Sequence, residues 1–375
     1  MSEARGDALE RAGLFDESLD AYGVALRASD EPVRKSDLML KRARVRAFGS
    51  SYSAGLGELT KARRLLESES SNSAQGGRAR LDSFRAVIRM MQGRSDDALH
   101  LAEKALVEAA EAGEKEALAR AYTVLDAACL TLGRVSEADY LPRALGMYEE
   151  MGDLLGVALV TNNMGERAWL EGRLDDAVDL YSKADEANRR AGNDPEAAIG
   201  RMNIGEVLIA QGRFKEAKVI LEDSSRVLRA HNSRAAVEAD IHLARVALEN
   251  GELEASQKAL HGAVAEATKT GQSEYALVAR IHLAEAYAAE GQLTRALQLL
   301  DEAESEIDQG GDLYGPLLAK VRAIALRDIG RKSEALESAI YGLDAARRLR
   351  MQHQETQLEV LLVELSAQIQ VVSSI

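Results

Sequence analysis

The stretch TNNMGERAWLEGRLDDAVDLY (residues 161–181) is followed, forty residues later, by the similar stretch RMNIGEVLIAQGRFKEAKVIL (residues 201–221). In each copy a glycine, Gly172 or Gly212, separates two segments whose apolar residues recur at helical spacing. A glycine can adopt the left-handed conformation that ends a helix, and the acidic residues that follow it are favourable at the start of the next helix. The stretch therefore predicts two helices joined by a tight turn.

The same turn recurs along the chain at a regular interval. Successive glycines lie 40, 39, 40, 39, 40 and 39 residues apart, at Gly93, Gly133, Gly172, Gly212, Gly251, Gly291 and Gly330. A period of this length is typical of a solenoid, in which each unit buries its apolar face against its neighbours. We therefore expect an all-α solenoid of about nine helical hairpins, closed at its end by a C-terminal capping helix.

Small side chains occupy two fixed positions around these turns. Five residues after the glycine stand Ala98, Ala138, Ala177, Ala217, Ser256, Ala296 and Ala335. Seven residues before it stand Ala86, Gly165, Gly205, Ala244, Ala284 and Ala323, with Asp126 as the exception. Since the distance between packed helices depends on the side chains at their contact, this pattern predicts that the two helices of each hairpin approach closely.

Composition supports an all-helical chain. Four prolines and an aromatic content of 4% leave nearly every segment free to form a helix, and no window alternates as a strand would. The single cysteine, Cys129, excludes an intrachain disulfide, and its apolar neighbours predict a small buried core residue.

Charge and hydropathy bear on partners and location. The net charge of −14 is spread along the chain, which disfavours binding to nucleic acid or to an anionic membrane. No stretch approaches the roughly 18 apolar residues that a membrane helix needs, and the first residues lack the apolar core of a signal peptide. A cytoplasmic location is expected.

The two ends of the chain depart from the regular pattern. Early turns at Gly13 and Gly57 give separations of 44 and 36 residues, so we predict a lengthened turn over 49–57 and a flexible loop over 68–77. The predicted organisation is a single solenoid over 1–375, with irregular repeats over 1–77, regular repeats over 78–350, and a cap helix and tail over 351–375.

Two further features of the repeats carry predictions. Pro142 falls inside the expected second helix of its repeat, which predicts a kink or a late start there. The closing helix carries Val360 and Val363 on its otherwise polar side, which leaves room for a partner or a homodimer contact.

The repeat pattern resembles the tetratricopeptide repeat (TPR), with small residues at unit positions eight and twenty, glycine at fifteen and a large residue at twenty-four. The long units look like those of kinesin light chain. Residues 152–193 are especially similar to the C-terminal TPR arrays of actinobacterial LuxR-type, maltose-activator-like regulators and ATPase-linked class III adenylate cyclases. The resemblance implies a right-handed superhelix whose concave wall is lined by the first helix of each repeat, and in the resembling adaptors that wall binds peptides.

Polar residues recur on this expected wall. On a common repeat frame, Asn163, Asn203, His242 and His282 share one position; Glu166, Glu206, Arg245 and Glu285 lie one turn further on; and Asn162 and Trp169 lie nearby. An asparagine amide both donates and accepts, so a series of such groups can pair with a peptide backbone. The other interpretation of these residues is a solvated polar face, with Trp169 serving in packing.

The favoured function is therefore a non-enzymatic scaffold or sensor that captures a peptide, a protein segment or a neighbouring domain in its groove, in bacterial signalling or transcription regulation. A small-molecule sensor of a larger regulator is the alternative, and a narrow, enclosed, polar pocket would favour it.

Catalysis and metal binding are disfavoured by the residues themselves. Nucleophile-elbow, P-loop, HExxH and dinucleotide motifs do not occur, and the signature ATPase and cyclase residues of the larger relatives are missing. His282 and Glu285 have a spacing found in carboxylate-bridged metal sites, but the equivalent of Glu285 in the preceding repeat is Arg245, a cation that would repel a metal. We predict neither cofactor nor metal.

Overall fold

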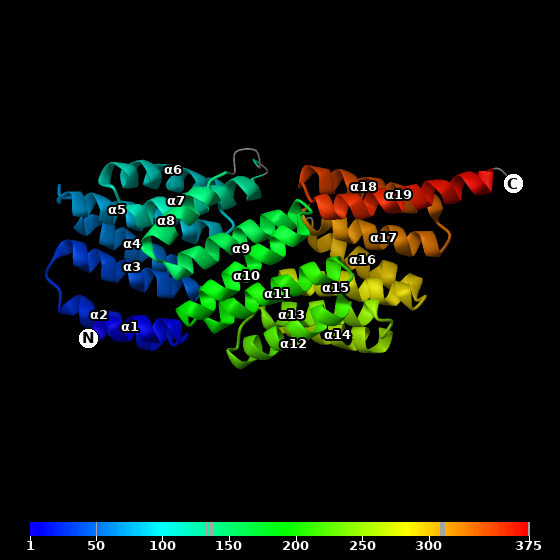
Figure 1. Cartoon of the computed structure of the whole chain (residues 1–375), viewed down its shortest axis with the longest axis horizontal. Coiled ribbons are helices and arrows are strands. Elements are labelled where there is room, and N and C mark those ends of the chain that lie inside the picture. Colours follow the sequence, from blue (N-terminus) through cyan, green and yellow to red (C-terminus); the bar gives the residue numbers. More distant parts are fainter. Residues whose placement is uncertain (50, 133, 135–138, 308–311, 374–375) are drawn as a thin grey trace. The chain divides into compact units, whose positions relative to one another are not determined.

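The structure is a computed structural model that describes residues 1–49, 51–132, 134, 139–307 and 312–373. Within these ranges the chain forms 19 α-helices and one short 3-10 helix at Asp312–Tyr314, without a β-strand (Figure 1). The all-α prediction is confirmed. None of the helices in this part of the chain combines the length and the apolar character that crossing a membrane requires.

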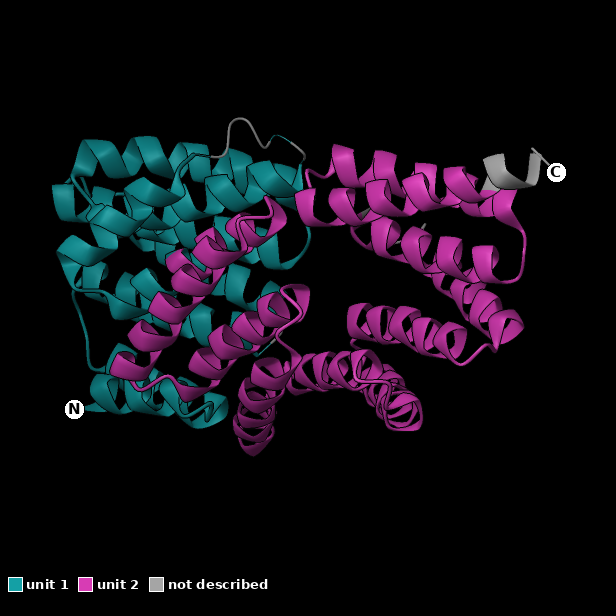
Figure 2. Cartoon of the chain, turned by 45° about the vertical axis from the view of Figure 1, so that its right-hand side comes forward, with its two compact units in different colours: residues 1–160 teal, residues 161–375 magenta. Residues whose placement is uncertain are grey.

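The chain divides into two compact units, residues 1–160 and 161–375 (Figure 2), with the boundary inside α9 (Leu154–Leu170). The first unit contains α1 (Ser2–Arg11), α2 (Phe15–Arg27), α3 (Pro32–Phe48), α4 (Tyr52–Leu65), α5 (Asn72–Met91), α6 (Ser95–Ala112), α7 (Lys115–Thr131) and α8 (Leu141–Met151). The second contains α10 (Leu174–Ala191), α11 (Asp194–Ala210), α12 (Phe214–Ala230), α13 (Ala236–Glu249), α14 (Leu253–Lys269), α15 (Ser273–Ala289), α16 (Leu293–Ile307), α17 (Gly315–Asp328), α18 (Lys332–Arg348) and α19 (Gln352–Ser373). The continuity of one solenoid over 1–375 stays a prediction.

The turn glycines have the conformation that their spacing predicts. Positive φ angles between 70° and 88° occur at Gly13, Gly93, Gly172, Gly212, Gly251, Gly291 and Gly330, while Gly133 lies outside the described residues. A side chain with a Cβ atom is strained in this left-handed region, which explains why glycine recurs there. Acidic residues such as Asp175 and Glu216 then occupy the first turn of the following helix.

Helices within a hairpin approach closely, as the small residues predict. The alanines and the serine five residues after each described turn glycine are fully buried, and Ala138 lies outside the described residues. A Cβ atom at Gly165 would lie 2.8 Å from the Tyr181 ring, and one at Gly205 would lie 2.6 Å from Leu221. Glycine is required at these two positions because a larger side chain would collide with the second helix.

The first helices of neighbouring repeats also pack on one another. In the second unit α11 contacts α13, α13 contacts α15, and α15 contacts α17. A core that includes Ile241, Leu260, Ile281 and Leu300 fills the space between them and their second helices. This double contact is what places the same face of each first helix along one wall, as expected for a TPR-like solenoid.

The predicted turn over 49–57 and the predicted loop over 68–77 are both too long, because helices occupy most of these residues. The helix α4 already begins at Tyr52, and α5 begins at Asn72, where the hydroxyl of Ser71 accepts the backbone N–H of Ala74 at 3.2 Å. The glycines suggested breaks, yet two of them are packing residues inside helices. A Cβ atom at Gly55 would lie 3.1 Å from the Ala43 carbonyl oxygen, and one at Gly77 would lie 2.8 Å from Leu66.

The late helix start at Pro142 is confirmed. The helix α8 begins at Leu141 with the proline in its first turn, where no backbone N–H is needed. Asp126, the exception among the small residues, is buried and accepts the backbone N–H of Tyr140 at 3.1 Å, directly before α8. Cys129 is 2% exposed, in agreement with its predicted core position.

The last helix, α19, caps the array with one apolar face. Leu358, Leu361 and Leu365 are buried against the preceding helices. Val360 and Val363 are 56% and 71% exposed on the other side of the helix. A homodimer through this exposed side stays a prediction.

A candidate ligand cavity in the second unit

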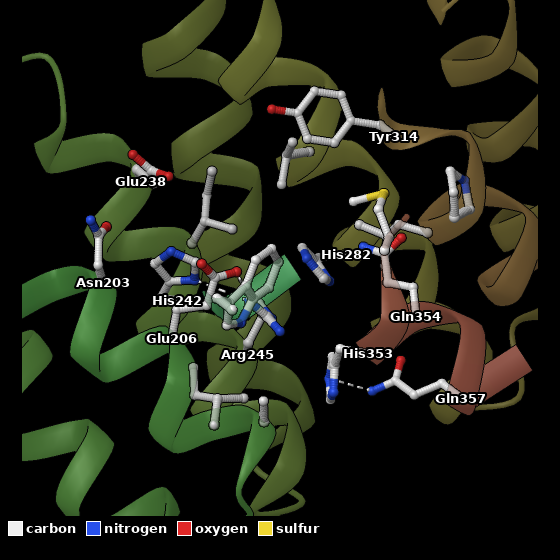
Figure 3. A pocket seen from close by; sticks show the side chains of 18 of the residues that line it. Asn203, Glu206, Glu238, His242, Arg245, His282, Tyr314, His353, Gln354 and Gln357 are labelled. Atoms are coloured by element: carbon white, nitrogen blue, oxygen red, sulfur yellow. Dashed lines mark hydrogen bonds and ion pairs between the residues drawn. The ribbon is translucent and has the colours of Figure 1, made fainter. Parts of the chain in front are cut away.

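A cavity of about 550 Å³ lies inside the second unit (Figure 3). Its wall comes mainly from the first helices of successive repeats, α9, α11, α13, α15 and α17, together with the segment that begins α19. Apolar residues such as Ile241, Val278 and Leu317 alternate in the lining with polar ones. The volume lies within the range of about 300–1,000 Å³ that is usual for ligand pockets.

Nine of the ten candidate site residues line this cavity, namely Asn162, Glu166, Trp169, Asn203, Glu206, His242, Arg245, His282 and Glu285. Asn163 is half-buried and is not part of the lining; its neighbour Asn162 takes that place. His242 and His282 are only 5% and 4% exposed, less than an open wall would leave them. A role in ligand binding stays a prediction for all of them.

An asparagine pair joins two adjacent repeats. The Nδ2 atom of Asn203 on α11 donates to Oδ1 of Asn162 on α9 at 3.0 Å. This bond leaves Nδ2 of Asn162 and Oδ1 of Asn203 without a partner in the part of the chain that the structure describes. The pair can therefore offer one donor and one acceptor to a ligand.

Each histidine is bonded through Nδ1 to the residue one turn further along its own helix. On α13, Nη1 of Arg245 contacts His242 Nδ1 at 3.1 Å and Glu206 Oε1 at 3.3 Å. On α15, His282 Nδ1 contacts Glu285 Oε2 at 2.9 Å. Figure 3 shows His242, Arg245 and His282 side by side in the middle of the lining.

Burial and these contacts set the charge states. Burial lowers the pKa of His242 to about 4 and also lowers the pKa of His282, so both rings are neutral near pH 7. Burial by itself would raise the pKa of Glu285, but the His282 hydrogen bond and Lys320 outweigh it and hold that pKa at about 2. Burial likewise opposes ionisation of Glu206, but the charge of Arg245 keeps its pKa below the usual range.

Carboxylates without a cationic partner lie on one side of the cavity. Burial raises the pKa of Glu238 to about 7, with a further contribution from Glu206, and the Tyr275 hydroxyl is hydrogen-bonded to Glu238. Burial and Glu206 also raise the pKa of Glu166. Neither carboxylate forms an ion pair among the described residues, so this side of the cavity disfavours a further negative charge.

The opposite side is built by the start of α19. In Figure 3 His353, Gln354 and Gln357 lie across the cavity from Glu238. Lys320 donates to Gln357 Oε1 at 3.1 Å, and Gln357 Nε2 contacts His353 Nε2 at 3.0 Å. The His353 ring lies 6.4 Å from that of Trp169 on α9, so the first and last helices of this unit meet at the cavity.

Sequence reasoning missed several lining residues. Glu238 stands one helical turn before His242, so the spacing rule for one helix face could have found it. Lys320 lies on α17, ten residues before its turn glycine, as Asn162 does on α9, so the repeat frame could have found it too. Nothing in the repeat pattern points to His353 or Gln357, because they meet the wall only through the return of α19. Within the described residues, no group of three or more His, Cys, Asp or Glu side chains is placed to hold a metal ion.

The fold and the cavity define a class of protein, a TPR-like helical repeat protein with a cavity in its second unit. Family models for the tetratricopeptide repeat match residues 156–230 and 277–302. A search of curated proteins found no significant match.

Solved structures similar to this chain include two Rap proteins. One was crystallised with Competence and Sporulation Factor; it is 15% identical, has a TM-score of 0.60, and the alignment covers 98% of this chain and 97% of that one. The other is the Rap conjugation gene regulator of plasmid pLS20 with the Phr* peptide, at 15% identity, a TM-score of 0.59 and coverage of 90% and 96%.

A third similar structure is the Signal Transduction ATPase with Numerous Domains from Pyrococcus horikoshii, which has a tetratricopeptide repeat sensor. It is 15% identical with a TM-score of 0.56, and the alignment covers 95% of this chain and 54% of that one. At these identities the likeness concerns the fold. The all-helical TPR-like architecture is therefore common to this chain, the two Rap proteins and the aligned part of the third.

Proposed function

We propose that this chain is a cytoplasmic, non-enzymatic TPR module of a bacterial regulator that captures a short peptide, or a segment of a neighbouring domain, in the cavity of its second unit. The observation that carries the proposal is the lining itself. Polar groups from successive repeats stand there beside apolar side chains, so the lining can contact both the backbone and the side chains of a peptide.

Unsatisfied polar atoms support a ligand at this place. Trp169 Nε1 and Gln354 Oε1 are buried and have no hydrogen-bond partner in the described structure, and both residues line the cavity. A buried donor or acceptor without a partner costs about 1–3 kcal/mol, which a bound ligand can offset. Two of the similar structures were solved with such occupants, one with Competence and Sporulation Factor and one with the Phr* peptide.

A small-molecule sensor remains the second candidate, because the volume of the cavity suits a metabolite. Binding of a synthetic random hexapeptide pool, followed by size-exclusion chromatography and mass spectrometry of the retained peptides, separates the two. Retention of a subset of hexapeptides supports the proposal. Thermal stabilisation by a cell metabolite extract, with no peptide retained, supports the alternative.

The asparagine pair gives the site-directed version of this test. Replacing Asn162 and Asn203 together by alanine removes two amides from the lining, and at about 1 kcal/mol each this should lower peptide retention at least about tenfold. The matched control is Asn163→Ala, which changes the neighbouring asparagine outside the lining and should retain peptides as the parent does. Equal retention by the double variant and the parent would remove the asparagine pair from the site.

A further inference from the structure

His242 and His282 occupy equivalent positions on α13 and α15, 40 residues apart, and both line the cavity. Each side chain is more than nine-tenths buried. In each ring Nδ1 is bonded, while Nε2 makes no hydrogen bond with any residue that the structure describes. Two ring nitrogens that line the cavity are therefore left for a ligand.

The partners of Nδ1 are opposite in kind. A guanidinium only donates, so the contact from Arg245 requires His242 Nδ1 to accept, which puts the single proton of a neutral ring on Nε2. An ionised carboxylate only accepts, so the contact with Glu285 requires His282 Nδ1 to carry the proton, which leaves a lone pair on Nε2. The change from Arg245 to Glu285 at one repeat position thus reverses the tautomer.

Both rings must be neutral for this arrangement to hold. The groups that face them are Glu206, Arg245 and Lys320, besides Glu285 and the other histidine. Their combined effect with burial leaves the pKa of each ring below its ordinary value, so neither is protonated near pH 7. The two Nε2 atoms therefore differ in function: one is a donor and the other an acceptor.

We infer that His242 and His282 form a donor and acceptor pair for the backbone of an extended ligand. The His242 Nε2–H group donates to a backbone carbonyl oxygen, and His282 Nε2 accepts a backbone N–H. In an extended chain the N–H and C=O groups of every second residue point to the same side, as in the hydrogen-bonded pairs of an antiparallel sheet. This inference rests on the proposed peptide-binding function and adds to it a side-chain-independent means of recognition.

The tautomers are tested on the full chain without a ligand. Long-range ¹H–¹⁵N correlation spectra of ¹⁵N-histidine-labelled protein at pH 7.5, with signals assigned through His242→Gln and His282→Gln, distinguish protonated from bare ring nitrogens. The expected result is an Nε2–H ring for His242 and an Nδ1–H ring for His282. The same tautomer at both positions, or a charged ring at either, would overturn the inference.

The backbone contact is tested with two probes, the random hexapeptide pool and the same pool N-methylated at every amide. The parent should retain the unmodified pool at least about tenfold better, and His282→Phe should reduce that preference to about twofold or less. The control is His231→Phe, at an exposed histidine of the same unit outside the lining, which should keep the preference.

The outcomes separate the two proposals. A parent protein that retains neither pool contradicts the peptide-binding function and, with it, this inference. Retention of peptides with an undiminished preference in His282→Phe contradicts the histidine pair alone. Melting temperatures of both phenylalanine variants within a few degrees of the parent exclude loss of the fold as the cause.

Discussion

At the scale of single residues, the cavity places ionisable groups where burial works against their charge. Glu238 and Glu166 lie beside Glu206 and have no cation of their own among the described residues, whereas Glu206 has Arg245. Retaining unpaired carboxylates in a cavity costs folding free energy, and a positively charged ligand group would offset that cost. Under the proposed function, this side of the cavity favours basic peptides over acidic ones.

The cost at Glu238 predicts a pH dependence. Because the folded pKa of about 7 lies above the ordinary value of 4.5, the folded state binds more protons between these values, and stability falls as the pH rises through this window. Glu238→Gln should therefore raise the free energy of unfolding at pH 8, by an amount on the order of 2 kcal/mol, and change it little at pH 5.

Urea unfolding of parent and variant at the two pH values measures this effect. Taking the difference between the two proteins cancels the opposite contribution of His242, whose lowered pKa makes the folded state less stable as the pH falls from 6.5 towards 4. An equal difference at pH 5 and pH 8 would contradict the assignment to Glu238.

At the scale of the helix, the first helix of each repeat in the second unit has two faces with different contacts. One face carries small residues that meet the second helix of the hairpin, and the other carries polar residues that line the cavity. On α9, Gly165 and Glu166 are consecutive residues on these two faces. The packing of a hairpin therefore determines where its polar residues project.

Gly165→Leu tests this coupling. The new side chain would collide with the Tyr181 ring, so we expect a loss of stability of about 1–3 kcal/mol or more and a weaker peptide retention, since Glu166 and Asn162 would shift with the helix. The control is Gly262→Leu on α14, where a Cβ atom meets nothing within 4 Å; that variant should be neutral or slightly stabilised, because glycine weakens a helix interior. Equal melting temperatures for the two variants would contradict the close-approach account.

At the scale of the whole molecule, the informative feature lies within the second unit, where its end returns to its beginning. Leu170 at the end of α9 packs on Met351 and Leu358, and the turn residue Gly172 lies beside Gln352. These residues are about 180 positions apart in the sequence. This contact gives the cavity its far side, which His353, Gln354 and Gln357 form.

Leu358→Ala should loosen this closure. The side chain is fully buried, so its truncation should cost about 2–5 kcal/mol. Hydrogen exchange should become faster both in α19 and in residues 162–170 of α9, although the two segments are distant in sequence. Val360→Ala, at an exposed position of the same helix, should leave both segments unchanged. Faster exchange in α19 alone would show that the contact with α9 does not stabilise it.

The sequence by itself determined the repeat, the left-handed turn glycines, the small residues at the hairpin contacts and most of the polar wall. All of these depend on local backbone geometry and on spacing within one or two helices. Such features recur in the sequence with a period of 39 or 40 residues and can therefore be recognised from it. The sequence predicted a turn around Gly55 and a loop around Gly77, whereas both are packing residues inside helices. A glycine at a helix contact cannot be distinguished from a glycine in a turn until the neighbouring helix is known.

Only the tertiary structure decided that Asn162 rather than Asn163 faces the cavity, and that α19 supplies its far side. A rotation of one residue about a helix axis turns a side chain by about 100°, so small differences in helix packing select between neighbours. The return of α19 depends on small rotations between repeats that accumulate along the second unit. No single spacing in the sequence contains that sum, which is why the far side of the cavity could not be predicted.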